Sequence, residues 1–100
     1  MRTHQGQIVA DAITSGETDI PTTGTPVQLN STSTKCFGVI VSNPNATNAI
    51  YIGDSAVDKT SARGIQLKAG EQVFIPVGDV NLLYADGTSN GDDVGWLILK

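Results

Sequence analysis

The feature that most constrains this chain is the regular spacing of its turn-forming residues. Gly, Pro, Asn and Asp recur about every eight to twelve residues, and short runs rich in β-branched and aromatic residues lie between them. No segment sustains the apolar period of an amphipathic helix. The pattern predicts a single-domain, all-β protein of 100 residues, an antiparallel β-sandwich of about eight short strands with either a jelly-roll or an immunoglobulin-like order.

The runs between the turns predict strands at residues 7–13, 18–22, 25–29, 35–42, 49–53, 64–67, 72–77, 80–85 and 94–99. A polar segment, "TSGET", follows the first run and is expected to be a linker. Residues 1–16 are therefore expected to be an extended N-terminal arm or a first strand, and residues 17–100 the β-sandwich domain.

Several turns carry their own signals. The segment "SNPNATN" should reverse the chain between Ser42 and Ala49, because its proline fixes φ and its amides tolerate left-handed conformations. In "LKAGEQ", Gly70 should take the positive φ angle of a hairpin. Pro76 cannot donate a ladder hydrogen bond, so its strand should lie at a sheet edge or end there.

Apolar residues occupy both faces of the C-terminal strands. Alternation predicts that Val94, Trp96 and Ile98 oppose Leu97 and Leu99. In "VNLLYA" it predicts that Val80, Leu82 and Tyr84 oppose Leu83 and Ala85. An antiparallel sheet that met water on its outer face would carry polar residues there, so we expect a cover. A second subunit would provide it, and a homotrimer is our preferred oligomer; loops that bury both faces are the alternative.

Composition excludes several classes of partner. The formal net charge is −4, the sequence pI is about 4.5, and the six Lys and Arg residues are scattered, so we expect no nucleic-acid binding. No apolar run is long enough to span a bilayer, and the N-terminus lacks the apolar core of a secretory signal, so we expect neither a membrane partner nor Sec export. The single cysteine, Cys36, allows no intramolecular disulfide and is expected to be a buried thiol.

Catalytic constellations are scarce. The only histidine, His4, lies in a polar N-terminal segment, which disfavours both a metal-dependent cupin and a serine hydrolase. Carboxylate pairs that could serve as glycosidase acid and base all fall in expected turns, where Asp is favoured for structural reasons. These residues are Asp54, Asp58, Asp86, Asp92 and Asp93. We therefore expect a protein that is not an enzyme.

The segment "DGTSNGDD" has the oxygen-rich composition of a calcium loop. Its candidate ligands are Asp86, Asn90, Asp92 and Asp93, although the spacing is not that of an EF-hand. A hairpin turn with positive φ at Gly87 and Gly91 explains the same residues. We favour the turn and expect no metal and no cofactor.

From about Ile20 onward the order of motifs resembles a group of small structural proteins of tailed phages. The resemblance rests on "IPTTGTPVQL", "CFGVIVSNPNATNAIYIGDSAV" and "GIQLKAGEQVFIPVGDVNLLYADGTSNGDDVGWLIL". It implies a non-enzymatic virion protein, assembled in the host cytoplasm, that binds copies of itself and the major capsid protein.

The first hypothesis from this resemblance is a capsid decoration or cement protein that sits on the capsid surface and stabilises the shell. The alternative is a module of a fibre or baseplate that binds a host-surface glycan or protein. The N-terminal residues lie outside the resemblance. Their apolar members, Ile8, Val9 and Ile13, are candidates for docking an arm onto a partner.

Overall fold

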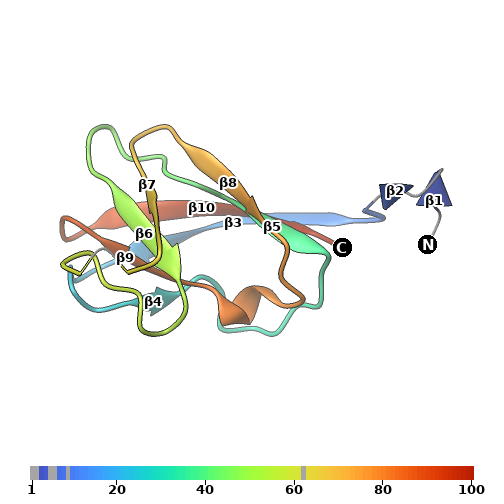
Figure 1. The fold of residues 1–100 in the computed structure, drawn as a ribbon, viewed down its shortest axis with the longest axis horizontal. Coiled ribbons are helices and arrows are strands. Elements are labelled where there is room, and N and C mark those ends of the chain that lie inside the picture. Colours follow the sequence, from blue (N-terminus) through green and yellow to red (C-terminus); the bar gives the residue numbers. More distant parts are fainter. Residues whose placement is uncertain (1–2, 5–6, 9, 62) are drawn as a thin grey trace.

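The computed structural model describes residues 3–4, 7–8, 10–61 and 63–100 of the chain. Two four-stranded antiparallel sheets pack face to face, as the sequence predicts, with almost no helix (Figure 1). The first sheet has the order β3, β10, β5, β8 (Ile13–Ile20, Asp92–Leu99, Gly38–Ser42, Gln72–Ile75). The second has the order β4, β9, β6, β7 (Val27–Gln28, Tyr84–Gly87, Ile50–Gly53, Ile65–Leu67).

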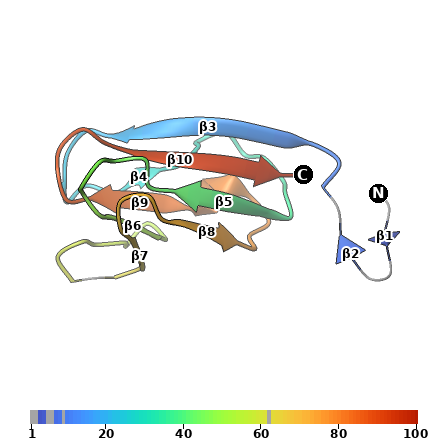
Figure 2. The same ribbon diagram turned by 90° about the horizontal axis from the view of Figure 1, so that it is seen from above.

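The strand order identifies a jelly roll. Strand β6 pairs with β7, β5 with β8, β4 with β9 and β3 with β10, each time antiparallel. The chain is thus a long hairpin with its tip between β6 and β7, and its paired arms roll up into the two sheets. Figure 2 shows the strands of the first sheet side by side in this order. An immunoglobulin-like order is thereby excluded.

The core lies between the two sheets and is built by alternation along each strand. Val39 and Val41 of β5 and Ile50 of β6 are fully buried, as are Val94 and Ile98 of β10. Their neighbours in sequence point to the outer faces, because successive side chains of a strand alternate. The predicted division of the last strand is confirmed, since Trp96 also packs against this core.

The predicted turns of the middle segments are confirmed. Strand β5 ends at Ser42 and β6 begins at Ile50, so "SNPNATN" does connect them. Gly70 has a φ angle of 82°. Strand β8 is an edge strand that ends at Ile75, directly before Pro76. Local turn chemistry determined these boundaries, which explains why the sequence alone located them.

The expectation for the N-terminal segments was wrong in two places. The "TSGET" segment is not a linker but part of β3, which runs without interruption through the expected boundary between residues 16 and 17. The expected strand at residues 7–13 is instead the short β2 (Gln7–Ile8), which pairs with β1 (Thr3–His4) in a separate two-stranded sheet. This mostly polar segment forms a strand because all eight residues of β3 pair with β10.

The expected strand at residues 80–85 was also wrong. Residues Val80–Leu82 form a 3₁₀ helix, η1, and the strand begins only at Tyr84, where β9 starts. The carboxylate of Asp79 caps η1 by accepting the backbone N–H of Asn81 at 3.1 Å, and this cap favours a helical turn over an extended start. The alternation predicted for "VNLLYA" therefore fails: Leu82 is exposed, whereas Val80 and Leu83 are buried.

The "DGTSNGDD" segment is a turn but not a hairpin. Strands β9 and β10 belong to different sheets, so residues 88–91 carry the chain from one layer of the sandwich to the other. Gly91 has the predicted positive φ angle, at 85°, whereas Gly87 does not. The local sequence signals a reversal, but nothing in it specifies which sheet the following strand joins.

Candidate interaction surface

An apolar patch lies on the outer face of the first sheet. It consists of five side chains that point away from the core, and we call it the outer patch: Ile13, Ile40, Phe74, Leu97 and Leu99. The strand register places Leu97 opposite Ile40, Ile40 opposite Phe74, and Leu99 opposite Ile13. Ile13 is 63% exposed and Phe74 is 49% exposed, while the other three are half-buried.

A glycine allows Phe74 to lie flat on the outer face. A Cβ atom at Gly38 would come within 2.6 Å of the Phe74 ring, so the ring rests directly on the glycine backbone. This packing holds one side of the ring against the sheet and presents the other side to the surroundings. Phe74 is therefore held in place within the outer patch.

The other end of the same face is acidic. Asp93 of β10 lies directly opposite Asp19 of β3, and Glu17 follows two residues away on the same face. Like charges directly opposite each other are destabilising. The outer face of this sheet is thus divided along its strands into an apolar half and an acidic half.

The candidate arm lies beyond the end of the sandwich. In both views the β1–β2 pair stands past the point where β3 begins and β10 ends (Figures 1 and 2). Ile13 belongs to β3 and to the outer patch, whereas Ile8 is in β2 and Val9 is outside the described residues. Backbone N–H groups of Asp11 and Ala12 donate to the carbonyl of Lys100, at 2.6 and 3.0 Å, and attach the base of the arm to the C-terminus.

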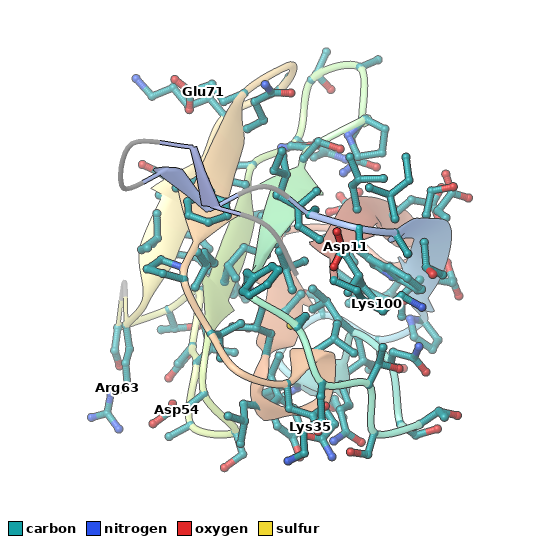
Figure 3. All side chains as sticks on the ribbon, turned by 90° about the vertical axis from the view of Figure 1, so that its right-hand side faces the viewer. Asp11, Lys35, Asp54, Arg63, Glu71 and Lys100 are labelled. Atoms are coloured by element: carbon teal, nitrogen blue, oxygen red, sulfur yellow. The ribbon has the colours of Figure 1, made fainter. Side chains whose placement is uncertain are left out.

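Figure 3 looks at this end of the sandwich. Asp11 and Lys100 lie next to each other beside the β3–β10 pair, and Lys35 lies at the lower edge. Charges of both signs are therefore present here, in contrast with the acidic half of the outer face.

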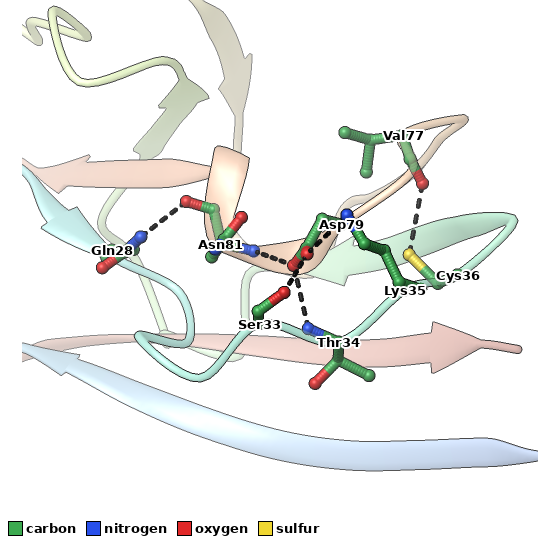
Figure 4. A network of polar contacts seen from close by, with 8 residues as sticks. All are labelled: Gln28, Ser33, Thr34, Lys35, Cys36, Val77, Asp79 and Asn81. Carbon is green, nitrogen blue, oxygen red and sulfur yellow. Dashed lines mark hydrogen bonds and ion pairs between the residues drawn. The ribbon is translucent and has the colours of Figure 1, made fainter.

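Lys35 contacts a polar network that joins the loop before β5 to η1 (Figure 4). At its centre the Asp79 carboxylate accepts hydrogen bonds from the Ser33 hydroxyl and from the N–H of Thr34 at 2.9 Å. The Lys35 ammonium lies 3.6 Å away. The Ser33 hydroxyl and the backbone N–H donors of Asn81 and Thr34 lower the pKa of Asp79 to about 2. This carboxylate serves to hold the two segments together.

Cys36 lies at the border of the same network. Its thiol donates to the carbonyl oxygen of Val77 at 3.2 Å and is half-buried, not fully buried as expected. Burial raises the pKa of the Cys36 thiol above its ordinary value. A raised pKa means less thiolate at neutral pH, so the environment of this cysteine does not favour reactivity.

The four calcium candidates mainly hold loops together. The buried carboxylate of Asp86 accepts N–H groups of Gly24 at 2.9 Å and Lys59 at 3.0 Å. Asp92 accepts the Asn48 amide and the N–H of Ser89, both at 3.0 Å. The Asn90 side-chain oxygen accepts the N–H of Thr23 at 2.8 Å, whereas the Asp93 side chain points to the outer face. Within the described residues, no three His, Cys, Asp or Glu side chains are grouped to hold a metal ion.

The other carboxylate candidates stabilise their own loop. Asp54 accepts the N–H of Ala56 at 3.0 Å, and Asp58 accepts the N–H of Thr60 at 2.8 Å. The Thr60 bond lowers the pKa of Asp58. Such side chain-to-backbone bonds are the structural role that favours Asp in turns. His4 is in β1, and its side chain lies outside the described part of the structure.

A second polar network, not anticipated from the sequence, connects the "SNPNATN" loop to β10. Buried Asn43 donates to the carbonyls of Asn48 and Leu67, at 2.8 and 2.9 Å, and accepts the Asn45 amide at 2.7 Å. Asn45 in turn exchanges two hydrogen bonds with the backbone of Asp93, both at 2.9 Å. The cluster of asparagines in this loop was the available signal, because buried amides need several partners.

The described residues form no pocket. Among them, no helix is long and apolar enough to cross a membrane. No protein-family model matches the chain, and no curated protein or solved structure matches it either.

Proposed function

We propose that this protein is a non-enzymatic structural protein of a tailed-phage virion, a decoration protein that binds the outer face of the major capsid shell and stabilises it. The observation that carries the proposal is the outer patch. Monomeric proteins rarely expose contiguous apolar surface without a use for it, and such a patch beside polar residues is typical of a protein interface. The order of strand motifs, which resembles small virion proteins, supports a shell as the partner.

The acidic half of the outer face supports a partner of defined chemistry. Asp19, Asp93 and Glu17 repel one another in the isolated chain, and a basic surface would relieve that repulsion on binding. We infer that the shell presents an apolar site next to Lys or Arg side chains. Many copies, each with modest contacts, would join neighbouring capsid subunits and resist outward pressure.

The arm supplies a second contact in this proposal. The β1–β2 pair lies beyond the sandwich at the same end as Ile13, so an arm and the outer patch could contact one shell at adjacent positions. Assembly of this kind takes place in the host cytoplasm, where the virion forms.

Fold alone does not separate this proposal from the host-binding alternative, because both viral capsid and lectin domains use the jelly roll. A glycan array, probed in calcium and again in chelator, distinguishes the two. We expect no binding in either condition. Calcium-dependent binding of a glycan would replace the decoration proposal with a host-recognition module.

Mixing the purified protein with capsids of its phage, followed by sedimentation, tests the outer patch. Phe74→Asp should weaken capsid binding at least about tenfold, because it places a charge on apolar contact area. Gln72→Asp is the matched control, since it adds the same charge two residues along the same strand and face but at the acidic half. Equal binding by Phe74→Asp and the wild type would contradict the role of the patch.

Asp19→Lys tests the acidic half in a way that separates binding from folding. Lysine opposite Asp93 replaces a repulsion by an attraction, so the variant should be more stable by about 0.5–1 kcal/mol. It should nevertheless bind capsids more weakly, and the loss should shrink as salt is raised. A stabilised variant with undiminished binding at low salt would rule out a basic partner surface.

A further inference from the structure

The outer edge of β3 presents backbone groups to which no described residue of the sandwich is hydrogen-bonded. Ala12 and Lys100 exchange two hydrogen bonds, at 3.0 and 2.8 Å, which sets the phase of the β3–β10 ladder. Hydrogen-bonded and non-hydrogen-bonded pairs alternate along an antiparallel ladder. The backbone N–H and C=O groups of even-numbered β3 residues therefore point toward β10. The N–H and C=O groups of Ile13, Ser15, Glu17 and Asp19 therefore point away from the sheet.

This edge differs from the other three edges of the sandwich. The edge strands β4, β7 and β8 contain two, three and four residues, and Pro76 follows β8. Strand β3 has eight residues and contains no Pro, Lys or Arg. Short edges, proline and lysine are the usual protection against pairing with another chain. In the part of the chain that the structure describes, β3 is the long edge, and its only charged side chains are those of Glu17 and Asp19.

We propose that β3 pairs with β3 of a second copy, antiparallel and about a two-fold axis that passes between the two Gly16 residues. This pairing closes a dimer, and it replaces the homotrimer expected from the sequence. The two first sheets would join into one continuous eight-stranded sheet. In this register Ser15 lies opposite Glu17 of the other copy, Thr14 opposite Thr18, and Ile13 opposite Asp19.

The charges of β3 select this register among its neighbours. A two-fold axis perpendicular to the sheet pairs residues of the same face. In the proposed register the numbers of each residue pair add up to about 32, and the neighbouring registers have sums of about 30 and 34. One step in one direction places Glu17 opposite Glu17, and like charges directly across are unfavourable. One step in the other direction pairs only residues 13–17 of the two strands, so it forms fewer hydrogen bonds. The register centred on Gly16 has no like-charged pair.

The half-buried Trp96 supports the same axis. Its ring covers Gly16 so closely that a Cβ atom there would lie 2.3 Å from it, and its indole N–H donates to Thr18 at 3.0 Å. The ring therefore extends toward the free edge on the inner face. With Gly16 on the axis, the two Trp96 rings approach each other across the joined sheet, and each covers exposed area of the other.

The pairing gives the outer patch a second role, which rests on the proposed function. A two-fold axis perpendicular to the sheet keeps the outer faces of both copies on the same side. Two outer patches and two acidic halves would then face one shell together. Simultaneous engagement of both copies raises the overall affinity without any new contact.

Sedimentation equilibrium of the full chain tests the pairing, at loading concentrations from about 1 μM to about 1 mM, which covers the affinities of weak and moderate interfaces. We expect a reversible monomer–dimer equilibrium. Ser15→Pro removes an N–H that points to the free edge and none that faces β10, so it should weaken the dimer at least about tenfold. Ser15→Ala keeps this N–H and should leave the dimer unchanged. A wild type that stays monomeric throughout would overturn the proposal.

Charge variants test the register and do not depend on the folding of the proline variant. Ser15→Glu faces Glu17 of the other copy and should weaken the dimer, whereas the double variant Ser15→Glu, Glu17→Lys should restore it. No recovery in the double variant would overturn this register. A monomeric wild type whose Ser15→Pro variant loses capsid binding would assign the edge to a strand of the shell protein instead. Dimerisation without capsid binding would contradict the proposed function and leave the pairing intact.

Discussion

Replacing Gly16 by alanine should destabilise the protein, although alanine is normally the better residue in a strand. The new Cβ would lie 2.3 Å from the Trp96 ring, far inside normal contact distance, and the hydrogen bond from the indole to Thr18 opposes movement of the ring. Overpacking of this kind costs about 1–3 kcal/mol. Alanine recovers about 0.5–1 kcal/mol of backbone entropy relative to glycine. The expected net loss is therefore between about 0 and 2.5 kcal/mol, with a central value of about 1 kcal/mol.

The same substitution should change sign when the ring is absent. In a Trp96→Ala background nothing opposes the Cβ, so Gly16→Ala should stabilise the chain by about 0.5–1 kcal/mol. Trp96→Ala alone should cost about 3 kcal/mol, near the low end for a Trp truncation because the ring is half-buried. Trp96 and Gly16 should therefore be coupled by about 1–3 kcal/mol in a double-mutant cycle.

Urea unfolding followed by far-UV circular dichroism measures all four proteins, since Trp96 fluorescence is lost in two of them. The measurements should be made at low protein concentration, where self-association contributes little. A Gly16→Ala substitution that has the same effect with and without Trp96 would refute the close packing of the ring on β3. The assignment of Trp96 to the inner face at the edge of the sandwich would then be wrong.

Three further predictions concern the two polar networks and the arm. The pKa of Asp79 is lowered from 3.8 to about 2 in the folded chain, so its stabilisation is complete only above about pH 5 and is lost as the pH falls toward 2. In urea titrations, Asp79→Asn should lose less stability over this range. Asn43→Ala should cost about 2–3 kcal/mol by urea unfolding because it leaves buried partners without hydrogen bonds. Asn30→Ala should cost well under 1 kcal/mol, because Asn30 is only half-buried and its side chain bonds an exposed N–H of Thr32. Deletion of residues 1–9 should leave the thermal midpoint nearly unchanged and weaken capsid binding, whereas deletion of residues 1–16 removes half of β3 and should unfold the sandwich.

The parts of the fold that local chemistry determines could be predicted from the sequence. Pro76 ends β8, Gly70 takes a left-handed conformation, and the asparagine-rich loop follows Ser42, because each of these residues restricts its own backbone. The jelly-roll order depends instead on which sheet each strand joins. Short apolar runs do not encode that choice locally, so the sequence is compatible with two strand orders that only the strand pairings distinguish.

The errors have a common physical cause, which is that tertiary partners override local propensity. Polar β3 is a strand because β10 pairs along its whole length, while apolar Val80 begins a helical turn because Asp79 caps it. The sequence indicated the outer patch only in β10 and at Ile13. Ile40 alternates with buried Val39 and Val41, and Phe74 alternates with partly buried Val73 and Ile75. The alternation applied to β10 would also have assigned both residues to the outer face.

Quantitative mass spectrometry of purified virions of the phage that encodes this chain tests the central proposal most directly. A decoration protein should be present at a copy number comparable to that of the major capsid protein, and it should be reduced in particles assembled with Phe74→Asp. Complete absence from the particle would contradict a virion role. A copy number of only a few per particle would contradict decoration of the shell and would assign the protein to the tail.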